Sequence, residues 1–157
     1  MSFTTGVLLP GFILPVCRQA GYNANMILFI DTTERGFAVL AIIAKDKLWQ
    51  IKFEAASKLS ETLPAKLQNF FKKNKLTLPE ITKIVVVRGH GSFVGTRTGV
   101  AWANALAWAL NLPILGLAAD QIPSDKLQLN KAKFKKGIVA PKYSAPPNIT
   151  IPKSGRV

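Results

Sequence analysis

Apolar and polar positions alternate in blocks along the middle of the chain, and these blocks predict an α/β fold. Five apolar runs have the length of β-strands and are separated by polar or glycine-containing turns. They cover residues 27–30, 37–43, 48–53, 83–87 and 113–117. Between 57 and 75 apolar residues recur at helical spacing, with Ser60 or Thr62 available as the N-cap. A second helix is predicted from Gly99 to Asn111.

The order of these elements, β-β-β-α-β-α-β, indicates a ribonuclease H-like layer. An antiparallel meander comes first, and the two helical crossovers that follow build a mixed five-stranded sheet. Strand 37–43 is apolar at nearly every position, so we expect both faces of the sheet to be covered. A weaker pattern from Ser124 to Lys136, with Gly137 as its stop, predicts a helix on the second face.

The predicted helix 99–111 is apolar all round, which a helix facing water cannot be. Trp102, Leu106 and Trp108 project in several directions, and alanines fill the positions between them. Burial inside one fold is one explanation. We favour a protein partner, bound by helices 59–74 and 99–111. The expected contact residues are Leu63, Leu67, Phe70, Trp102, Leu106 and Trp108.

A glycine-rich loop joins strand 83–87 to this helix. Such a loop either turns sharply or lets another surface approach closely. It points amides at a helix N-terminus, as anion sites do, but its spacing fits neither the dinucleotide fingerprint nor the P-loop, which needs a lysine. The loop residues singled out are Gly89, Gly91, Ser92, Phe93, Gly95, Arg97 and Gly99.

Few residues of this chain could support catalysis. Asp31 ends the first strand, where a nuclease of this fold holds metal, but Glu61 is the only further acid nearby, and two-metal chemistry needs several carboxylates. Asp31 bonding the amides of its own turn is an equal alternative. His90 and Ser92 lack an orienting acid, so an exposed or interface imidazole is the better interpretation. We therefore expect no catalytic residue, no metal and no cofactor.

Composition bounds the remaining possibilities. The 157 residues carry 21 Lys and Arg against 8 Asp and Glu, a net charge of +13 that favours an acidic partner such as RNA. The single cysteine, Cys17, fits a reducing cytoplasm. We expect one domain at 26–118, an N-terminal extension at 1–25 outside the fold, and a basic segment at 119–157. Its proline-containing end is either a disordered tail or an arm laid on a surface, and its lysines either help hold RNA or form a solvated face.

Three segments together resemble one known family. Residues 26–33 (MILFIDTT), 58–64 (KLSETLP) and the loop 89–99 (GHGSFVGTRTG) are similar to the TsaB family, also called YeaZ, of bacterial tRNA threonylcarbamoyladenosine synthesis. The family usually writes the loop as GPGSFTGLRIG, and this chain keeps seven of those eleven positions. It departs at His90, Val94, Thr96 and Thr98.

The resemblance implies a fold of the actin-like ATPase kind and a non-catalytic role. Such proteins bind TsaD, the subunit that transfers threonylcarbamoyl to N6 of the adenosine next to the anticodon, and TsaE, an ATPase, joins them. A homodimer of the chain alone stays open, and no membrane partner is expected. A divergent nuclease or resolvase of the same fold and a free-standing nucleotide-binding module are the alternative functions.

Overall fold

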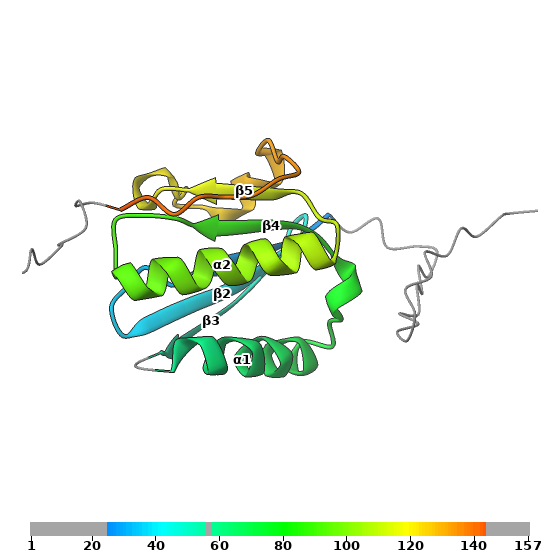
Figure 1. Cartoon of the computed structure of the whole chain (residues 1–157). Helices are drawn as coiled ribbons and strands as arrows, with labels where there is room; N and C mark the ends of the chain where they lie inside the picture. Colours follow the sequence, from blue (N-terminus) through cyan, green and yellow to red (C-terminus); the bar gives the residue numbers. More distant parts are fainter. Residues whose placement is uncertain (1–24, 56–57, 144–157) are drawn as a thin grey trace, which may run out of the picture.

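One five-stranded mixed sheet forms the centre of the protein (Figure 1). The computed structural model describes residues 25–55 and 58–143. The strands are β1 (Met26–Asp31), β2 (Phe37–Ile43), β3 (Leu48–Glu54), β4 (Ile81–Val87) and β5 (Ile114–Leu117), in the order β3-β2-β1-β4-β5. The pairs β1–β2 and β2–β3 are antiparallel, whereas β1–β4 and β4–β5 are parallel. The predicted mixed sheet and element order are confirmed.

Two helices, α1 (Leu59–Lys73) and α2 (Phe93–Ala109), lie on the same side of the sheet (Figure 1). Alternate residues of the strands point toward them and form the larger of two core clusters. Helix α1 starts after Lys58, which makes no side-chain cap, so the predicted caps at Ser60 and Thr62 are wrong. Both residues already lie in the first turn, and the Thr62 hydroxyl donates to the Lys58 carbonyl oxygen at 2.8 Å.

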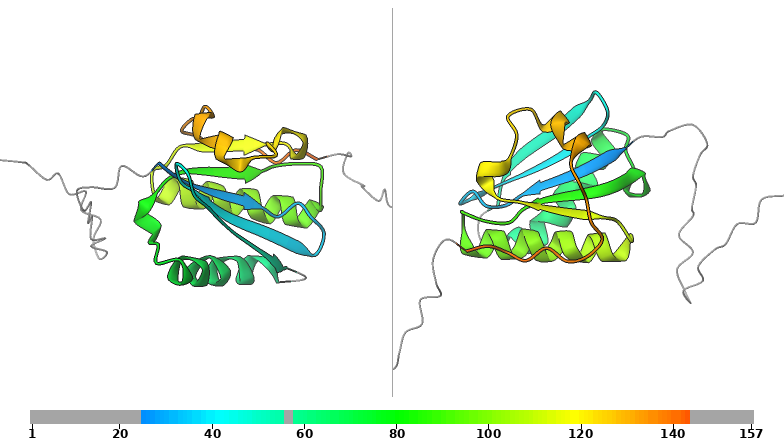
Figure 2. Two further views of the ribbon diagram at one scale, coloured as in Figure 1. Left: turned by 180° about the vertical axis from the view of Figure 1, so that it is seen from behind. Right: turned by 90° about the horizontal axis from the view of Figure 1, so that it is seen from above.

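The opposite face of the sheet is covered by irregular chain rather than by the predicted helix 124–136 (Figure 2). Only two short 3-10 turns form there, η2 (Ala119–Gln121) and η3 (Lys126–Lys131). The cap of η3 is Asp125, whose carboxylate accepts from the Leu127 amide at 2.9 Å, and not Ser124. The turn η3 ends at Lys131, and the chain then runs on to Lys135, which pairs through its backbone with Ile114 at the start of β5. Leu129 nevertheless closes the second core cluster.

After this cover the chain returns to the helix side as an extended segment, residues 138–143, which we call the C-terminal arm (Figure 2). The Asn104 side chain on α2 donates to the Val139 carbonyl at 2.8 Å and accepts from the Val139 amide at 2.9 Å. Farther along, Lys142 bridges to Gly89 in a parallel sense. The proline-containing end was predicted to be either a disordered tail or an arm, and its residues 140–143 lie along the surface as an arm. Residues 1–24 and 144–157 lie outside the described part. Within the described ranges, no helix has the length and apolar character needed to cross a membrane.

Candidate functional site at the start and outer face of helix α2

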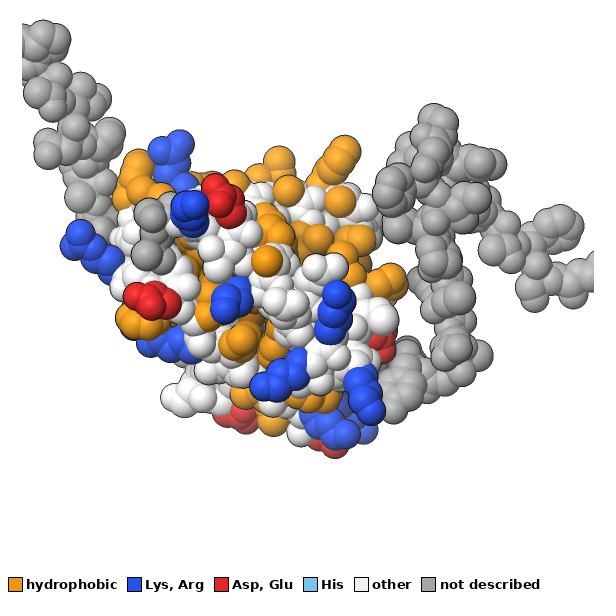
Figure 3. Space-filling view, turned by 90° about the horizontal axis from the view of Figure 1, so that it is seen from below, with side chains coloured by type: hydrophobic (Ala, Val, Ile, Leu, Met, Phe, Trp, Pro, Cys, Tyr) orange, Lys and Arg blue, Asp and Glu red, His pale blue; other side chains and the backbone are white. Residues whose placement is uncertain are grey.

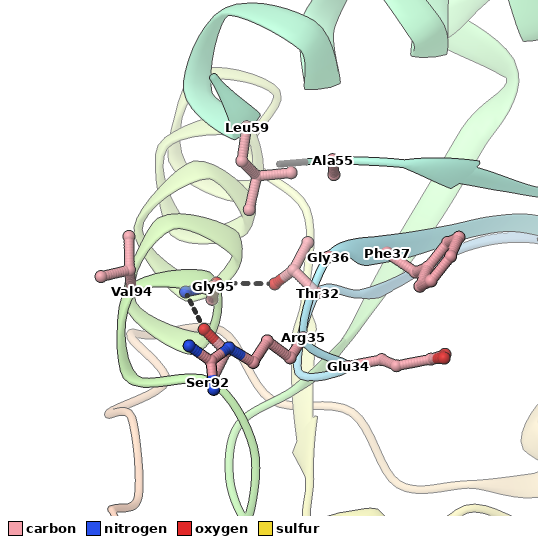
Figure 4. A pocket seen from close by; sticks show the side chains of 10 residues that line it. All are labelled: Thr32, Glu34, Arg35, Gly36, Phe37, Ala55, Leu59, Ser92, Val94 and Gly95. Carbon is pink, nitrogen blue, oxygen red and sulfur yellow. Dashed lines mark hydrogen bonds between the residues drawn. The ribbon is translucent and has the colours of Figure 1, made fainter. Parts of the chain in front are cut away.

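Helix α2 begins at Phe93, six residues before its predicted start at Gly99. Gly95 and Gly99 are therefore inside the helix, and only Gly89 and Gly91 belong to the connecting loop. Ser92 is the N-cap, and its hydroxyl oxygen accepts from the Gly95 amide at 3.3 Å (Figure 4). The prediction placed the start too late because glycine lowers helix propensity in any pattern-based assignment.

The glycines at 91, 95 and 99 form a stripe that lies against the turn after β1. A Cβ on Gly91 would overlap the Thr33 carbonyl, one on Gly95 the Thr32 carbonyl, and one on Gly99 the Thr32 hydroxyl. The Thr32 hydroxyl donates to the Gly95 carbonyl at 2.8 Å (Figure 4). The sequence predicted either a sharp turn or the close approach of another surface. The glycines allow a close approach, and the surface that approaches is the turn after β1 of the same chain.

Gly89 serves a second close approach, on the other side of the loop. A Cβ there would stand 2.9 Å from the Lys142 carbonyl oxygen of the C-terminal arm. Between the two contacts, His90 adopts a left-handed conformation with φ of 61° and is exposed. The loop is thus held between the β1 turn and the arm by contacts to backbone.

The polar residues considered for catalysis serve local structure. One Asp31 carboxylate oxygen accepts from the Thr33 amide at 3.0 Å and from its hydroxyl at 2.7 Å, which is the turn-forming alternative. The Ser92 hydroxyl is engaged as the helix cap, and Glu61 is exposed in the first turn of α1. Within residues 25–55 and 58–143, no three His, Cys, Asp or Glu residues come together as a metal site.

A shallow pocket of about 280 Å³ opens beside this junction, between the β1–β2 turn and the starts of both helices (Figure 4). Arg35 points from the turn toward Ser92, and Val94 and Leu59 form the opposite wall. Glu34 points away from the pocket and pairs with Lys52 at 2.7 Å. Arg97, the positively charged residue of the predicted loop, does not line this pocket.

Arg97 instead belongs to an exposed aromatic cluster. Its guanidinium lies 5.2 Å from the centre of the Phe93 ring, and that ring lies 4.8 Å from the ring of Tyr143 on the arm. Sequence reasoning did not select Tyr143, because nothing in the local pattern indicates that the arm returns to α2.

The six predicted partner residues fall into two groups. Leu63, Leu67 and Phe70 are buried beneath α1, so their assignment to a surface is wrong. The apolar stripe of α1 faces the sheet, and the outward residues of that helix are mainly polar. Trp102 and Leu106 are half-buried, whereas Trp108 is 87% exposed.

Helix α2 carries several exposed apolar side chains along one edge of this side. In the view from the α1 side, hydrophobic side chains form a band along the edge where α2 lies (Figure 3). The middle of the band consists of small alanine side chains, and larger side chains lie at its two ends. The exposed residues of α2 are Phe93, Val94, Arg97, Ala101, Ala105, Trp108 and Ala109. We call this band the α2 outer face.

Comparison with known proteins agrees with the sequence motifs and the fold. The chain is 36% identical over 66 residues to the tRNA threonylcarbamoyladenosine biosynthesis protein TsaB of Bacillus subtilis. It is 29% identical over 105 residues to the TsaB of Buchnera aphidicola. The chain is similar to the TsaB (YeaZ) family. The matches cover 42% and 66% of this chain but 27% and 47% of the relatives, so it spans at most about half of their length.

Two further comparisons describe the architecture of this chain. Residues 53–122 match the family model of TsaD, tRNA N6-adenosine threonylcarbamoyltransferase. The structure of YeaZ from Pseudomonas aeruginosa superposes with a TM-score of 0.56 at 20% identity, over 60% of this chain and 44% of that one. The expected actin-like, ribonuclease H-like fold is therefore confirmed.

Proposed function

We propose that this chain is a non-catalytic scaffold subunit for N6-threonylcarbamoylation of the adenosine next to the anticodon of tRNA. It binds a TsaD-type catalytic subunit in the cytoplasm, and a TsaE-type ATPase joins the pair. The observation that carries the proposal is the sequence likeness to two TsaB proteins, together with an unpartnered apolar band on the matching fold.

The α2 outer face is the surface we assign to the catalytic partner. A helix with alanines in its middle and aromatic residues at its ends lets another helix approach closely while the aromatic side chains anchor it. Trp108 is the strongest anchor, because it is the most exposed large side chain on α2. Helix α1 contributes polar outward residues to the rim, and a second copy of the chain would compete for the same face.

The glycine-rich junction supports this interface and binds no nucleotide of its own in this proposal. The Thr32 hydroxyl donates to the Gly95 carbonyl, and the Thr33 carbonyl accepts from the Ser92 amide. These bonds hold the first turn of α2 against the sheet and position Phe93 and Arg97 at the start of the outer face. Arg97 then pairs with a carboxylate of the partner. This role explains the glycine spacing without a phosphate site.

Coexpression with the cognate TsaD-type subunit tests the proposal. Tagged TsaD should retain the parent chain but lose Trp108→Asp, with a dissociation constant raised about 30-fold or more, the ratio that corresponds to a hot-spot loss of about 2 kcal/mol. Leu48→Asp, which places the same charge on the exposed edge strand β3, is the matched control and should still bind. Thermal melts of all three chains verify that they are folded.

The reconstituted complex gives the functional readout. The complex should modify tRNA only when the chain is present. With Trp108→Asp, the rate of threonylcarbamoylation should fall in proportion to the fraction of TsaD that no longer binds the chain. Retention of that variant by TsaD at parental affinity would place the interface elsewhere. Threonylcarbamoyl transfer by the chain without TsaD would contradict the non-catalytic role.

A further inference from the structure

The topology gathers lysines from separate segments at one end of the molecule. This end holds the starts of the parallel strands β1, β4 and β5, the ends of α1 and α2, the β2–β3 turn and the loop after η3 (right-hand side of Figure 1). We call it the basic end. Its lysines are Lys45, Lys47, Lys72, Lys73, Lys75, Lys83, Lys131, Lys133, Lys135 and Lys136.

Acidic side chains are scarce at the basic end. Asp46 lies in the β2–β3 turn, and Glu80 lies in η1 (Leu78–Glu80) before β4. The Glu80 carboxylate is already engaged, since it accepts from the Thr77 amide at 2.6 Å and from the Thr77 hydroxyl at 2.7 Å. The remaining acids of the described chain belong to other parts of the fold, so this end carries a concentrated positive potential.

Several contacts fix the lysine loop in this place. Lys135 exchanges backbone hydrogen bonds with Ile114, and the Lys136 ammonium donates to the Asn111 side chain at 3.1 Å, just past the end of α2. Phe134 packs toward the second core cluster, and the Lys83 ammonium lies 4.9 Å from the centre of its ring. The loop lysines therefore project from anchored backbone.

The size of the basic end indicates that its ligand is a polyanion rather than a small anion. It runs from the β2–β3 turn to the loop beside β5, across a sheet about 20 Å wide at about 4.8 Å per strand. Nucleic acid duplex of that length carries about a dozen phosphates, one per ~1.7 Å of axis. The basic end is built from turns and the ends of several elements, whereas the usual membrane-surface element is a single amphipathic helix.

We infer that the basic end is an RNA-binding surface that contacts the phosphates of a folded RNA. The choice of RNA among polyanions rests on the proposed function, but binding is a property of this chain alone. Exposed lysines contact phosphates without reading bases, so the surface positions the RNA and leaves selection of the target nucleotide to the catalytic partner. The α2 outer face and the basic end meet near Trp108 in the last turn of α2, whereas Phe93 and Arg97 lie at the opposite end of that helix.

Fluorescence anisotropy with labelled transfer RNA and the purified full chain tests this inference. The variant Lys133→Gln/Lys135→Gln/Lys136→Gln should flatten the slope of log K against log salt by about 2 to 3, since each phosphate contact contributes about 0.9. At 0.1 M salt, binding should be about 100-fold weaker. The control Arg35→Gln/Lys58→Gln/Lys142→Gln removes the same charge from exposed residues at the opposite end and should keep the parental slope.

Three results would overturn the inference. Equal losses in both triple variants would mean that net charge alone attracts RNA. An unchanged slope in the loop variant, followed by an unchanged slope in Lys72→Gln/Lys73→Gln/Lys75→Gln, would exclude the basic end. Binding to vesicles containing phosphatidylserine, with no RNA binding, would assign the surface to membranes. The RNA-binding experiment contains no TsaD. A negative result in it would therefore not argue against TsaD binding, and a failure to bind TsaD would not argue against RNA binding by the basic end.

Discussion

Adding one methyl group to the glycine stripe should destabilise α2, although the same change stabilises an ordinary helix. Gly→Ala in a helix interior normally contributes about 1 kcal/mol of stability. At Gly95 the new Cβ would overlap the Thr32 carbonyl oxygen, which is backbone and cannot rotate away. Overpacking costs about 1–3 kcal/mol, and we take the upper value because backbone must move. The expected net loss for Gly95→Ala is therefore about 2 kcal/mol.

Gly99 provides an internal comparison, because its Cβ would meet the Thr32 side chain rather than its carbonyl. Thr32→Ala removes the hydroxyl and methyl groups and should relieve Gly99→Ala but not Gly95→Ala. The double-mutant coupling energy should be about 1–2 kcal/mol for the 99/32 pair, and smaller for the 95/32 pair, where only the hydrogen bond from the Thr32 hydroxyl to the Gly95 carbonyl links the two residues. Thr32→Ala alone should cost about 1 kcal/mol for its lost hydrogen bond to the Gly95 carbonyl.

Urea unfolding of the purified chain measures these differences, with equal m-values required for comparison. Ala101→Gly, at an exposed position of the same helix, is the mirror control and should lose about 1 kcal/mol from propensity alone. If Gly95→Ala is as stable as the parent or more stable, the close approach of α2 to Thr32 is not what requires glycine there. Equal rescue of both glycine variants by Thr32→Ala would refute the assignment of the two contacts.

Two smaller predictions concern the arm and the β1 turn. Asn104→Ala removes both hydrogen bonds to Val139, so hydrogen exchange of the Val139 amide should accelerate by about tenfold or more, at about 1 kcal/mol per lost bond. Unchanged exchange would mean that other contacts hold the arm. Asp31→Ala should lower the free energy of unfolding by about 1–2 kcal/mol, because the Thr33 amide and hydroxyl lose their acceptor. Asp31→Asn keeps an acceptor oxygen and should lose less, and an equal loss in both variants would point to the charge instead.

The sequence by itself determined the sheet and carried the likeness to the TsaB family. Strand runs such as 37–43 are apolar at nearly every position because both faces are buried, and that local pattern located the strands to within a few residues. The order of strands and helices then left the mixed sheet as the simplest arrangement. The spacing of the glycines also carried the family resemblance. Gly91, Gly95 and Gly99 must lack a Cβ because each lies against Thr32 or Thr33.

Only the tertiary structure decided which surfaces are free and what the polar residues do. Leu63, Leu67 and Phe70 looked like interface residues because a helical stripe does not reveal whether it faces a sheet or a partner. Thr32 and Tyr143 are far in sequence from the residues they contact, so no local pattern pairs them with α2. The basic end likewise arises from distant segments that meet where the parallel strands begin. Contacts of this kind depend on chain topology, which brings separate segments together only in the folded state.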